Sequence, residues 1–413
     1  MDYPAFNSKG SDACVSESMA LADRIAAKLA QRRSIPVGHI ELLVTQECNH
    51  RCDYCFVKEK SGAHVMREEV GRRAIDFALK QAPRSPQCGV VFFGGEPLLE
   101  FSLVRELVGY GRARADQLNV AGKLSFSITT NGSLLTEEMA KFFHDQGIVY
   151  LLSVDGDRVV HDAHRKTLDG RSSYDLLMSR FGMMKHYQPW QGARVTVHPD
   201  HAPLVHDSVK HLFSVGINQF LIGPASGVEW QEQELYAYRD SLFAALKWTH
   251  EKAREGAPIR MAVLEKELDL PRGRNKGKWG CGAGRGRMCV DADGSLYPCS
   301  KMHGVGPARE TWRLGDVWHG ITNYRRRALL LSHDDTIRPE CRTCEMKDDC
   351  LGGCPANGLE ATGNPFLPSP LDCAMNRGLS GLRQDLAEYV RRHPPRARGR
   401  VMTGGLKHVR PLG

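Results

Sequence analysis

Six short runs rich in β-branched and other apolar residues recur between residues 40 and 222, and stretches long enough for helices separate them. The runs are Ile40–Val44, Val90–Phe93, Leu124–Thr129, Val149–Val154, Ala193–Val197 and Phe220–Ile222. Helices are expected between them, at Arg67–Lys80, Leu103–Ala115 and Thr136–Gln146. Strands that alternate with helices predict parallel βαβ units in an α/β fold. Six units predict a partial (β/α)6 barrel of the TIM type, with its site at the carboxyl ends of the strands.

Three cysteines follow the first of these runs at a spacing that favours a metal centre. Cys48, Cys52 and Cys55 form C-x3-C-x2-C on one short loop. Three thiolates there can each ligate one iron of a [4Fe–4S] cluster and leave the fourth iron open to a small molecule. Zinc is the alternative ion, because soft thiolates also select zinc.

The cysteine spacing, Tyr54 before the last cysteine and the position after a strand together resemble the radical SAM superfamily. Phe93-Gly-Gly-Glu-Pro97, after the second strand, extends the likeness, as do Thr130-Asn-Gly132, Ser153-Val-Asp-Gly156 and His161–Arg165. The resemblance implies that S-adenosylmethionine is bound by Gly94, Gly95, Glu96, Pro97, Asn131, Ser153 and Arg165. Glu96 would accept from the methionine ammonium, and Ser153 and Arg165 would contact the ribose or carboxylate.

Turn or helix-cap roles are the alternative for Asn131 and Asp155. No acid or base is assigned from the sequence.

A second set of cysteines begins at Cys281. An Asp293-Gly294 turn between two short β-rich runs predicts a hairpin that brings Cys281 and Cys299 together. The whole set resembles the SPASM extension of radical SAM enzymes. That likeness implies two auxiliary [4Fe–4S] clusters, one held by Cys341, Cys344, Cys350 and Cys373, the other by Cys281, Cys299 and Cys354.

Structural zinc is the alternative for the second set too, since Cys-x2-Cys is a common zinc pair. Three cysteines lie outside both sets. Cys289 is a possible further ligand or a small buried hydrophobe, and Cys14 and Cys88 are expected to have no function.

The resemblance implies three [4Fe–4S] clusters and S-adenosylmethionine, and an oxidoreductase that abstracts a hydrogen from a peptide or protein. Formation of a cross-link in a ribosomal peptide is one such reaction. A small-molecule dehydrogenase, an anaerobic sulfatase-maturating-type enzyme and a zinc-stabilised binding scaffold are the alternatives. The sulfatase-maturating branch carries an aspartate base after the cysteine that matches Cys299, whereas this chain has Ser300-Lys301. Formylglycine formation is therefore not expected.

An electron donor such as flavodoxin or ferredoxin is an expected partner. Some 38 N-terminal residues are too few for a leader-binding domain, so either a separate leader-peptide-binding protein recognises the leader or the substrate is recognised by its core. The formal net charge of +8 owes much to residues 391–413, which hold seven Lys or Arg and no acid. Without aromatic residues for base stacking, this segment does not favour nucleic acid. No apolar run is long enough to span a membrane, and no signal peptide is evident, so a cytoplasmic protein is expected.

The expected divisions are an N-terminal extension with a short helix at Ser16–Arg33 (1–38), the barrel (39–228), a helical bridge (229–280) and the SPASM domain (281–380). The end of a helix from about Asn376 to Arg391 and a basic disordered tail would complete the chain (381–413).

Overall fold

The computed structural model describes residues 35–57, 64–262, 281–304, 308–331 and 352–394, with a few isolated positions outside these ranges. The helix expected at Ser16–Arg33 falls almost wholly outside them. So do the last part of the bridge, 263–280, and the basic segment after residue 394.

Within the described residues, one eleven-stranded sheet has the order β13-β12-β11-β10-β1-β3-β4-β5-β7-β8-β9. Neighbours from β10 to β9 are parallel, and the pairs among β10, β11, β12 and β13 are antiparallel. The strands on the barrel side are β1 His39–Thr45, β3 Cys88–Gly94, β4 Leu124–Thr130, β5 Val149–Ser153, β7 Gln191–Val197, β8 Ile217–Pro224 and β9 Arg260–Met261. Those on the other side are β10 Arg287–Val290, β11 Ser295–Tyr297, β12 Gly315–Asp316 and β13 Gly320–Ile321. A separate two-stranded sheet joins β2 His50–Cys52 and β6 Arg165–Thr167.

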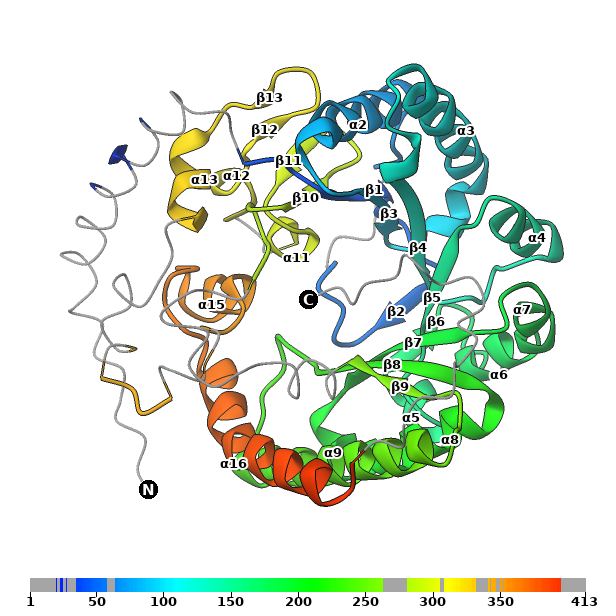
Figure 1. The fold of residues 1–413 in the computed structure, drawn as a ribbon, viewed down its shortest axis with the longest axis vertical. Helices are drawn as coiled ribbons and strands as arrows, with labels where there is room; N and C mark the ends of the chain where they lie inside the picture. Colours follow the sequence, from blue (N-terminus) through cyan, green and yellow to red (C-terminus); the bar gives the residue numbers. More distant parts are fainter. Residues whose placement is uncertain are drawn as a thin grey trace.

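Helices cover the outer face of the curved sheet (Figure 1). The barrel helices are α2 Glu68–Gln81, α3 Phe101–Gln117, α4 Glu137–Asp145, α5 Arg158–His164, α6 Ser173–Met178, α7 Phe181–Tyr187, α8 Val205–Val215 and α9 Glu232–Arg254. Later helices are α11 Ser300–His303, α12 Ala308–Thr311, α13 Tyr324–Leu331, α15 Pro355–Thr362 and α16 Pro370–Arg392. The α/β fold and its partial barrel are thus confirmed, with all six expected strands in one sheet.

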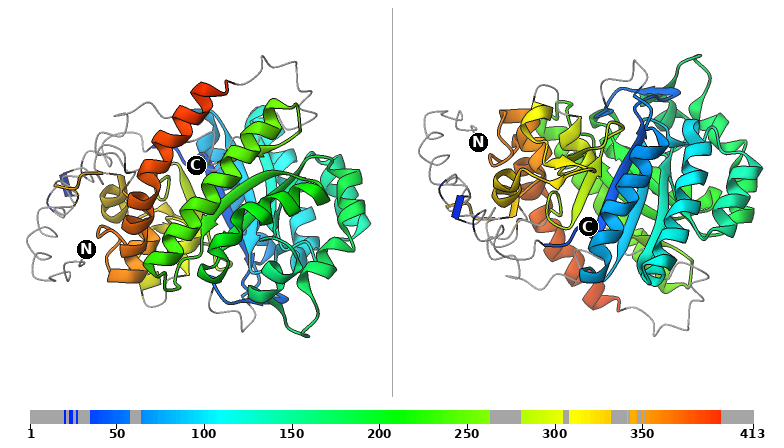
Figure 2. Two further views of the ribbon diagram at one scale, coloured as in Figure 1. Left: turned by 90° about the horizontal axis from the view of Figure 1, so that it is seen from below. Right: turned by 90° about the horizontal axis from the view of Figure 1, so that it is seen from above.

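Local signals explain where the helices begin. The Thr136 side chain accepts from the Met139 amide and caps α4, whose first turn carries two glutamates. The C-terminal helix starts six residues before the predicted Asn376, because Ser369 caps it and Pro370 occupies its first turn. The C-terminal helix, α16, packs on α9 (Figure 2).

The hairpin predicted around Asp293-Gly294 forms, with Val290 opposite Leu296. The sequence indicated that it belongs to a separate domain. In the structure its first strand, β10, instead pairs in parallel with β1, so that Ile40 lies beside Met288 and Leu42 beside Val290. An unpaired β1 would expose a row of backbone donors and acceptors, and β10 covers that edge. The cysteine-rich part therefore continues the barrel sheet.

None of the helices in the described part of the chain combines the length and apolar character needed to cross a bilayer.

Met288 tests whether the hairpin and the barrel form one folding unit. Its side chain is fully buried in the same core as Ile40 and Leu42. Met288→Ala should lower the free energy of unfolding by about 2–5 kcal/mol and speed hydrogen exchange in the 39–45 peptide of β1. Leu168→Ala, at a side chain 63% exposed, is the control and should change stability by less than about 0.5 kcal/mol. Unchanged exchange in β1 would show that the hairpin is structurally independent.

Candidate iron–sulfur and S-adenosylmethionine site

The loop after β1 holds Cys48, Cys52 and Cys55 half-buried at the carboxyl end of the strand. Pairing of β2 with β6 places Cys52 opposite Arg165. The Arg51 guanidinium donates to the Cys48 carbonyl at 2.6 Å, and the Cys55 amide donates to the Cys52 carbonyl at 3.1 Å. These contacts fix the backbone of the loop, and all three thiols are partly accessible to solvent.

Two glycines bring the end of β3 against this loop. A Cβ at Gly94 would lie 2.1 Å from the Thr45 carbonyl oxygen, and one at Gly95 would lie 2.0 Å from that of Glu47. The Gly95 amide donates to the Thr45 carbonyl and the Glu96 amide to the Glu47 carbonyl, each at 2.8 Å. From the sequence, these glycines are expected to let the backbone approach a ligand closely. The structure shows that they also permit backbone packing between β3 and the cysteine loop.

Glu96 joins the ends of β3 and β4. Its carboxylate, 1% exposed, accepts from the Leu98 amide at 3.1 Å, the Thr130 hydroxyl at 2.7 Å and the Asn131 amide at 2.8 Å. Burial raises the pKa of Glu96 to about 7, although these hydrogen bonds act against the rise. Pro97 is buried and begins the short helix η3, Pro97–Glu100. Glu96 is therefore a buried hub with three donors of its own.

Asn131 makes a turn and also reaches the cysteine loop. Its Oδ1 accepts from the Ser133 amide at 2.9 Å, as in the predicted turn. Its Nδ2 donates to Asn49 Oδ1 at 2.9 Å, and Asn49 Nδ2 donates to the Ser133 hydroxyl at 2.8 Å. The end of β4 is thereby tied to the residue that follows Cys48.

Asp155, two residues past β5, anchors the far side of the loop. Arg165 donates to it in bidentate fashion, at 2.8 and 2.9 Å, and both side chains are buried. The Tyr54 hydroxyl donates to the same carboxylate. Burial opposes the charge on Asp155, but Arg165 holds its pKa below the usual value. The pairing of Arg165 with Asp155 therefore competes with the cofactor role expected for Arg165. Ser153, also expected to contact the cofactor, is half-buried at the end of β5.

No sequence pattern indicated the pairing of Tyr54 with Asp155. The sequence does show that both residues follow strands whose ends lie on one rim. It does not show that the two side chains meet, because that depends on how the strands are aligned in the folded sheet.

The second cysteine set forms two groups. Cys281, Cys299 and Cys354 pack against one apolar cluster that contains Met302 and Trp312. Burial, and then the charges of Cys354 and its neighbours, raises the pKa of the Cys299 thiol well above its usual range. Burial by itself disfavours the thiolate, so these thiols would become thiolates on binding a metal centre, whose charge deprotonates a coordinating thiol.

In the other group, Cys373 on α16 lies close to Cys341 and Cys350. Burial, and then the charges of those two cysteines, raises its pKa to about 11. The Cys344 amide donates to the Cys341 carbonyl at 3.3 Å. Backbone amides also donate to thiol sulfurs at 3.3–3.4 Å, as found around iron–sulfur ligands, at Cys48, Cys281, Cys299, Cys344 and Cys350.

The remaining cysteines have different surroundings. Cys289 is fully buried on β10 in a cluster with Leu43 and Tyr297, which is the environment of a small core residue. Cys88 is buried at the start of β3, and burial raises its thiol pKa to about 11. Cys14 lies outside the described residues.

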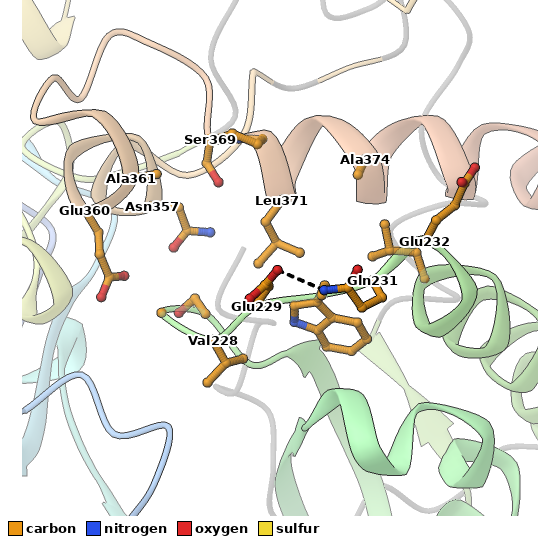
Figure 3. A pocket seen from close by; sticks show the side chains of 15 residues that line it. Val228, Glu229, Gln231, Glu232, Asn357, Glu360, Ala361, Ser369, Leu371 and Ala374 are labelled. Carbon is orange, nitrogen blue, oxygen red and sulfur yellow. Dashed lines mark hydrogen bonds between the residues drawn. The ribbon is translucent and has the colours of Figure 1, made fainter. Parts of the chain in front are cut away.

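A pocket of about 650 Å³ lies between the loop after β8 and the helices α15 and α16 (Figure 3). Its lining includes the carboxylates of Glu229, Glu232 and Glu360 and the indole of Trp230. Because the loop follows a barrel strand, the pocket opens on the same rim as the cysteine loop, where the barrel meets the cysteine-rich part.

Ser300 and Lys301 lie next to this pocket. Ser300 is buried, and its amide donates to Glu41 of β1 at 3.2 Å. The Lys301 ammonium contacts Ser226 and Asn357 and lies 3.6 Å from Glu360. Ser300 carries a hydroxyl, and the Lys301 ammonium is already paired, so neither side chain replaces an aspartate as the general base.

Comparison with known families accounts for the first cysteine set and for the part of the second set that precedes residue 346. Residues 42–185 match the radical SAM superfamily, and residues 281–345 match SPASM, described as an iron–sulfur cluster-binding domain. The chain is 26% identical over 354 residues to the serine-type anaerobic sulfatase-maturating enzyme of Klebsiella aerogenes, which covers 81% of this chain and 83% of that protein.

Two solved structures share the fold. One, "Native anSMEcpe with bound AdoMet and Cp18Cys peptide", superposes with a TM-score of 0.66 at 20% identity and covers 86% of this chain and 97% of that one. The other, Streptococcus suis SuiB bound to precursor peptide SuiA, gives a TM-score of 0.57 at 15% identity over 90% of this chain and 83% of that one.

The family matches imply iron–sulfur clusters and S-adenosylmethionine as cofactors, and the thiol groups described above supply the donors that such clusters need. The alternative of a zinc-stabilised, non-catalytic scaffold is thereby set aside. The chain carries a radical SAM domain and a SPASM iron–sulfur cluster-binding domain, and it is an enzyme of radical chemistry.

Proposed function

We propose that this enzyme oxidises a peptide or protein substrate by abstracting a hydrogen atom. The observation that carries the proposal is the loop of Cys48, Cys52 and Cys55, which three strand ends fix over the mouth of the barrel. When bound, the clusters and S-adenosylmethionine supply a 5′-deoxyadenosyl radical and an acceptor for the substrate's second electron. A low-potential donor of the flavodoxin or ferredoxin class supplies the first electron.

The chain's own residues hold these groups in three places. Cys48, Cys52 and Cys55 hold the cluster that reduces S-adenosylmethionine. Cys341, Cys344, Cys350 and Cys373 hold one auxiliary cluster, and Cys281, Cys299 and Cys354 hold the other. The grouping of these thiols in the fold supports the division.

The rim around the first loop binds S-adenosylmethionine. Candidate contacts are the backbone of Gly94, Gly95 and Pro97 and the side chains of Glu96, Asn131, Ser153 and Arg165. Since Glu96 and Arg165 already have internal partners, their main contribution is to hold the rim in shape before the cofactor arrives.

We assign the acidic pocket beside the rim to part of the peptide substrate. Its volume of about 650 Å³ is ample for a few side chains, and its carboxylates suit a segment with basic or amide groups. The relative that matures sulfatases and the two neighbours solved with peptides support the same substrate class. Formylglycine formation is not part of the proposal, because Ser300 and Lys301 stand where that branch carries its aspartate base.

Cluster content is the first test. Anaerobically loaded protein should hold about twelve irons and twelve sulfides, four of each per cluster. Changing Cys48, Cys52 and Cys55 together to Ala should remove about four irons and abolish formation of 5′-deoxyadenosine from S-adenosylmethionine and dithionite. Elemental analysis measures the iron and sulfide, and chromatography measures the 5′-deoxyadenosine. Stoichiometric zinc without sulfide would contradict the proposal.

Gly95 tests how the loop is held. Gly95→Ala should displace the loop and cost about four irons, because its Cβ would overlap the Glu47 carbonyl. Gly109→Ala on α3, where a Cβ meets nothing within 4 Å, is the matched control and should retain all the iron. Far-ultraviolet circular dichroism of both variants should match the wild type. Full iron in Gly95→Ala would show that the close packing at this glycine is unimportant for the cluster.

Cys344→Ala tests the role of the auxiliary group. If that cluster takes the substrate's second electron, the variant should still cleave S-adenosylmethionine while oxidised peptide, detected by mass spectrometry over pools of short peptides, falls at least about tenfold. Proportional loss of both activities would indicate a structural role only.

The same peptide reactions show whether the enzyme makes formylglycine as the sulfatase-maturating branch does. An aldehyde in a Cys- or Ser-containing sulfatase peptide, trapped by a hydrazide, would return the chain to the sulfatase-maturating branch.

A further inference from the structure

Two histidines and an aspartate form a cluster on the rim that the proposed function does not use. His164 ends α5, and His198 follows β7. Asp200 lies in the next element, the short helix η5, Pro199–Leu204. The rings of His164 and His198 stack with centroids 3.8 Å apart. The cluster therefore joins two βα connections at the carboxyl ends of the strands.

The three side chains together offer a nitrogen-and-oxygen donor set. One ligand atom from each, chosen among the ring nitrogens and carboxylate oxygens, lies within 4.8 Å of the others. Asp200 Oδ2 is 3.2 Å from His198 Nδ1 and 3.8 Å from His164 Nε2. Two imidazoles and one carboxylate are ligands of catalytic zinc sites and of other divalent transition-metal sites with open positions.

A second observation concerns the orientation of His164. Its Nδ1 lies 3.3 Å from Asp53 Oδ2. A carboxylate can only accept, so Nδ1 donates its proton, and in the neutral ring Nε2 then carries the lone pair. Lys166, 3.0 Å from the same oxygen, keeps Asp53 in place. Metal-bound histidines characteristically donate their other ring N–H to a carboxylate in this way.

The Nε2 atom of His164 is buried, and no donor group hydrogen-bonds to it. The residue is 8% exposed, and within the described part of the chain Nε2 makes no hydrogen bond. A buried lone pair with no donor is unfavourable, and a cation is one group that would satisfy it. The Asp200 side chain is 66% exposed, which leaves a path for an ion from solvent.

We propose that His164, His198 and Asp200 bind one divalent transition-metal ion of the zinc class, with Asp53 positioning His164. Coordination separates the two stacked rings, and the exposed Asp200 follows the ion. His201, whose ring centroid is 5.1 Å from that of His164, borders the open side. Asp53 directly follows Cys52, so the ion lies beside the cysteine loop but is held by a different set of ligands.

The test measures zinc on cluster-loaded protein. Wild type is dialysed anaerobically against zinc chloride and a weak chelator, and zinc, iron and sulfide are then determined on the same sample. One zinc per chain is expected beyond the cluster metals. X-ray absorption at the zinc edge should show nitrogen and oxygen neighbours at about 2.0–2.1 Å rather than sulfur at about 2.3 Å.

Four variants locate the ion. His164→Ala and Asp200→Asn should abolish or strongly weaken zinc binding with iron unchanged, and Asp200 is exposed enough for its variant to fold. Asp53→Asn should weaken binding about 10–100-fold, as loss of an outer-shell carboxylate does. His319→Ala is the control, because His319 pairs with Asp316 at 2.9 Å on the surface and is 74% exposed; it should bind zinc as wild type does.

Two results would overturn the proposal. One is equal zinc in wild type, His164→Ala and Asp200→Asn. The other is a sulfur-dominated absorption spectrum, which would place the zinc on cluster cysteines. Neither readout depends on catalysis, so loss of radical activity alone leaves this site standing, and loss of zinc alone leaves the proposed function standing.

Discussion

The site depends on polar contacts that tie one cysteine loop to the ends of three neighbouring strands. Asn131 at the end of β4 binds Asn49, and Asp155 beyond β5 binds Tyr54. At β3 the contact is between backbones, through Gly95 and its neighbour. These contacts are buried or half-buried, where hydrogen bonds and ion pairs are stronger than in water. Three thiols must converge on one small cluster, and contacts from several directions restrict the loop to that arrangement.

The strand that carries the loop also connects the two cysteine-rich regions. β1 ends at the first cysteine loop, and its otherwise open edge pairs with β10 of the SPASM region. Glu41 on the same strand accepts from the amide that follows Cys299. Because a strand within a sheet is stiff, the separation between the two regions is fixed by secondary structure rather than by a flexible linker. A fixed separation suits electron transfer between centres.

The rim presents few free acid–base groups beside the candidate cofactor contacts. Arg165 is paired with Asp155, Glu96 has three internal donors, and Lys301 is held by Ser226 and Asn357. The carboxylates of the neighbouring pocket are paired as well, Glu229 with Gln231, Glu232 with Tyr236 and Glu360 with Lys301, and His164, His198 and Asp200 form a cluster of their own.

Local sequence determined a large part of this protein. The alternation of β-rich runs with helical stretches predicted the partial barrel, and the spacing of Cys48, Cys52 and Cys55 predicted the family, because both signals lie within a few turns of chain. The turn at Asp293-Gly294 predicted the hairpin for the same reason. Tertiary structure decided the partners: β10 on β1, Asp155 on Tyr54, and Asp53 on His164. Those pairs are far apart in the chain and meet only once the parallel strands take their register and bring their carboxyl ends to one rim, which no local pattern encodes.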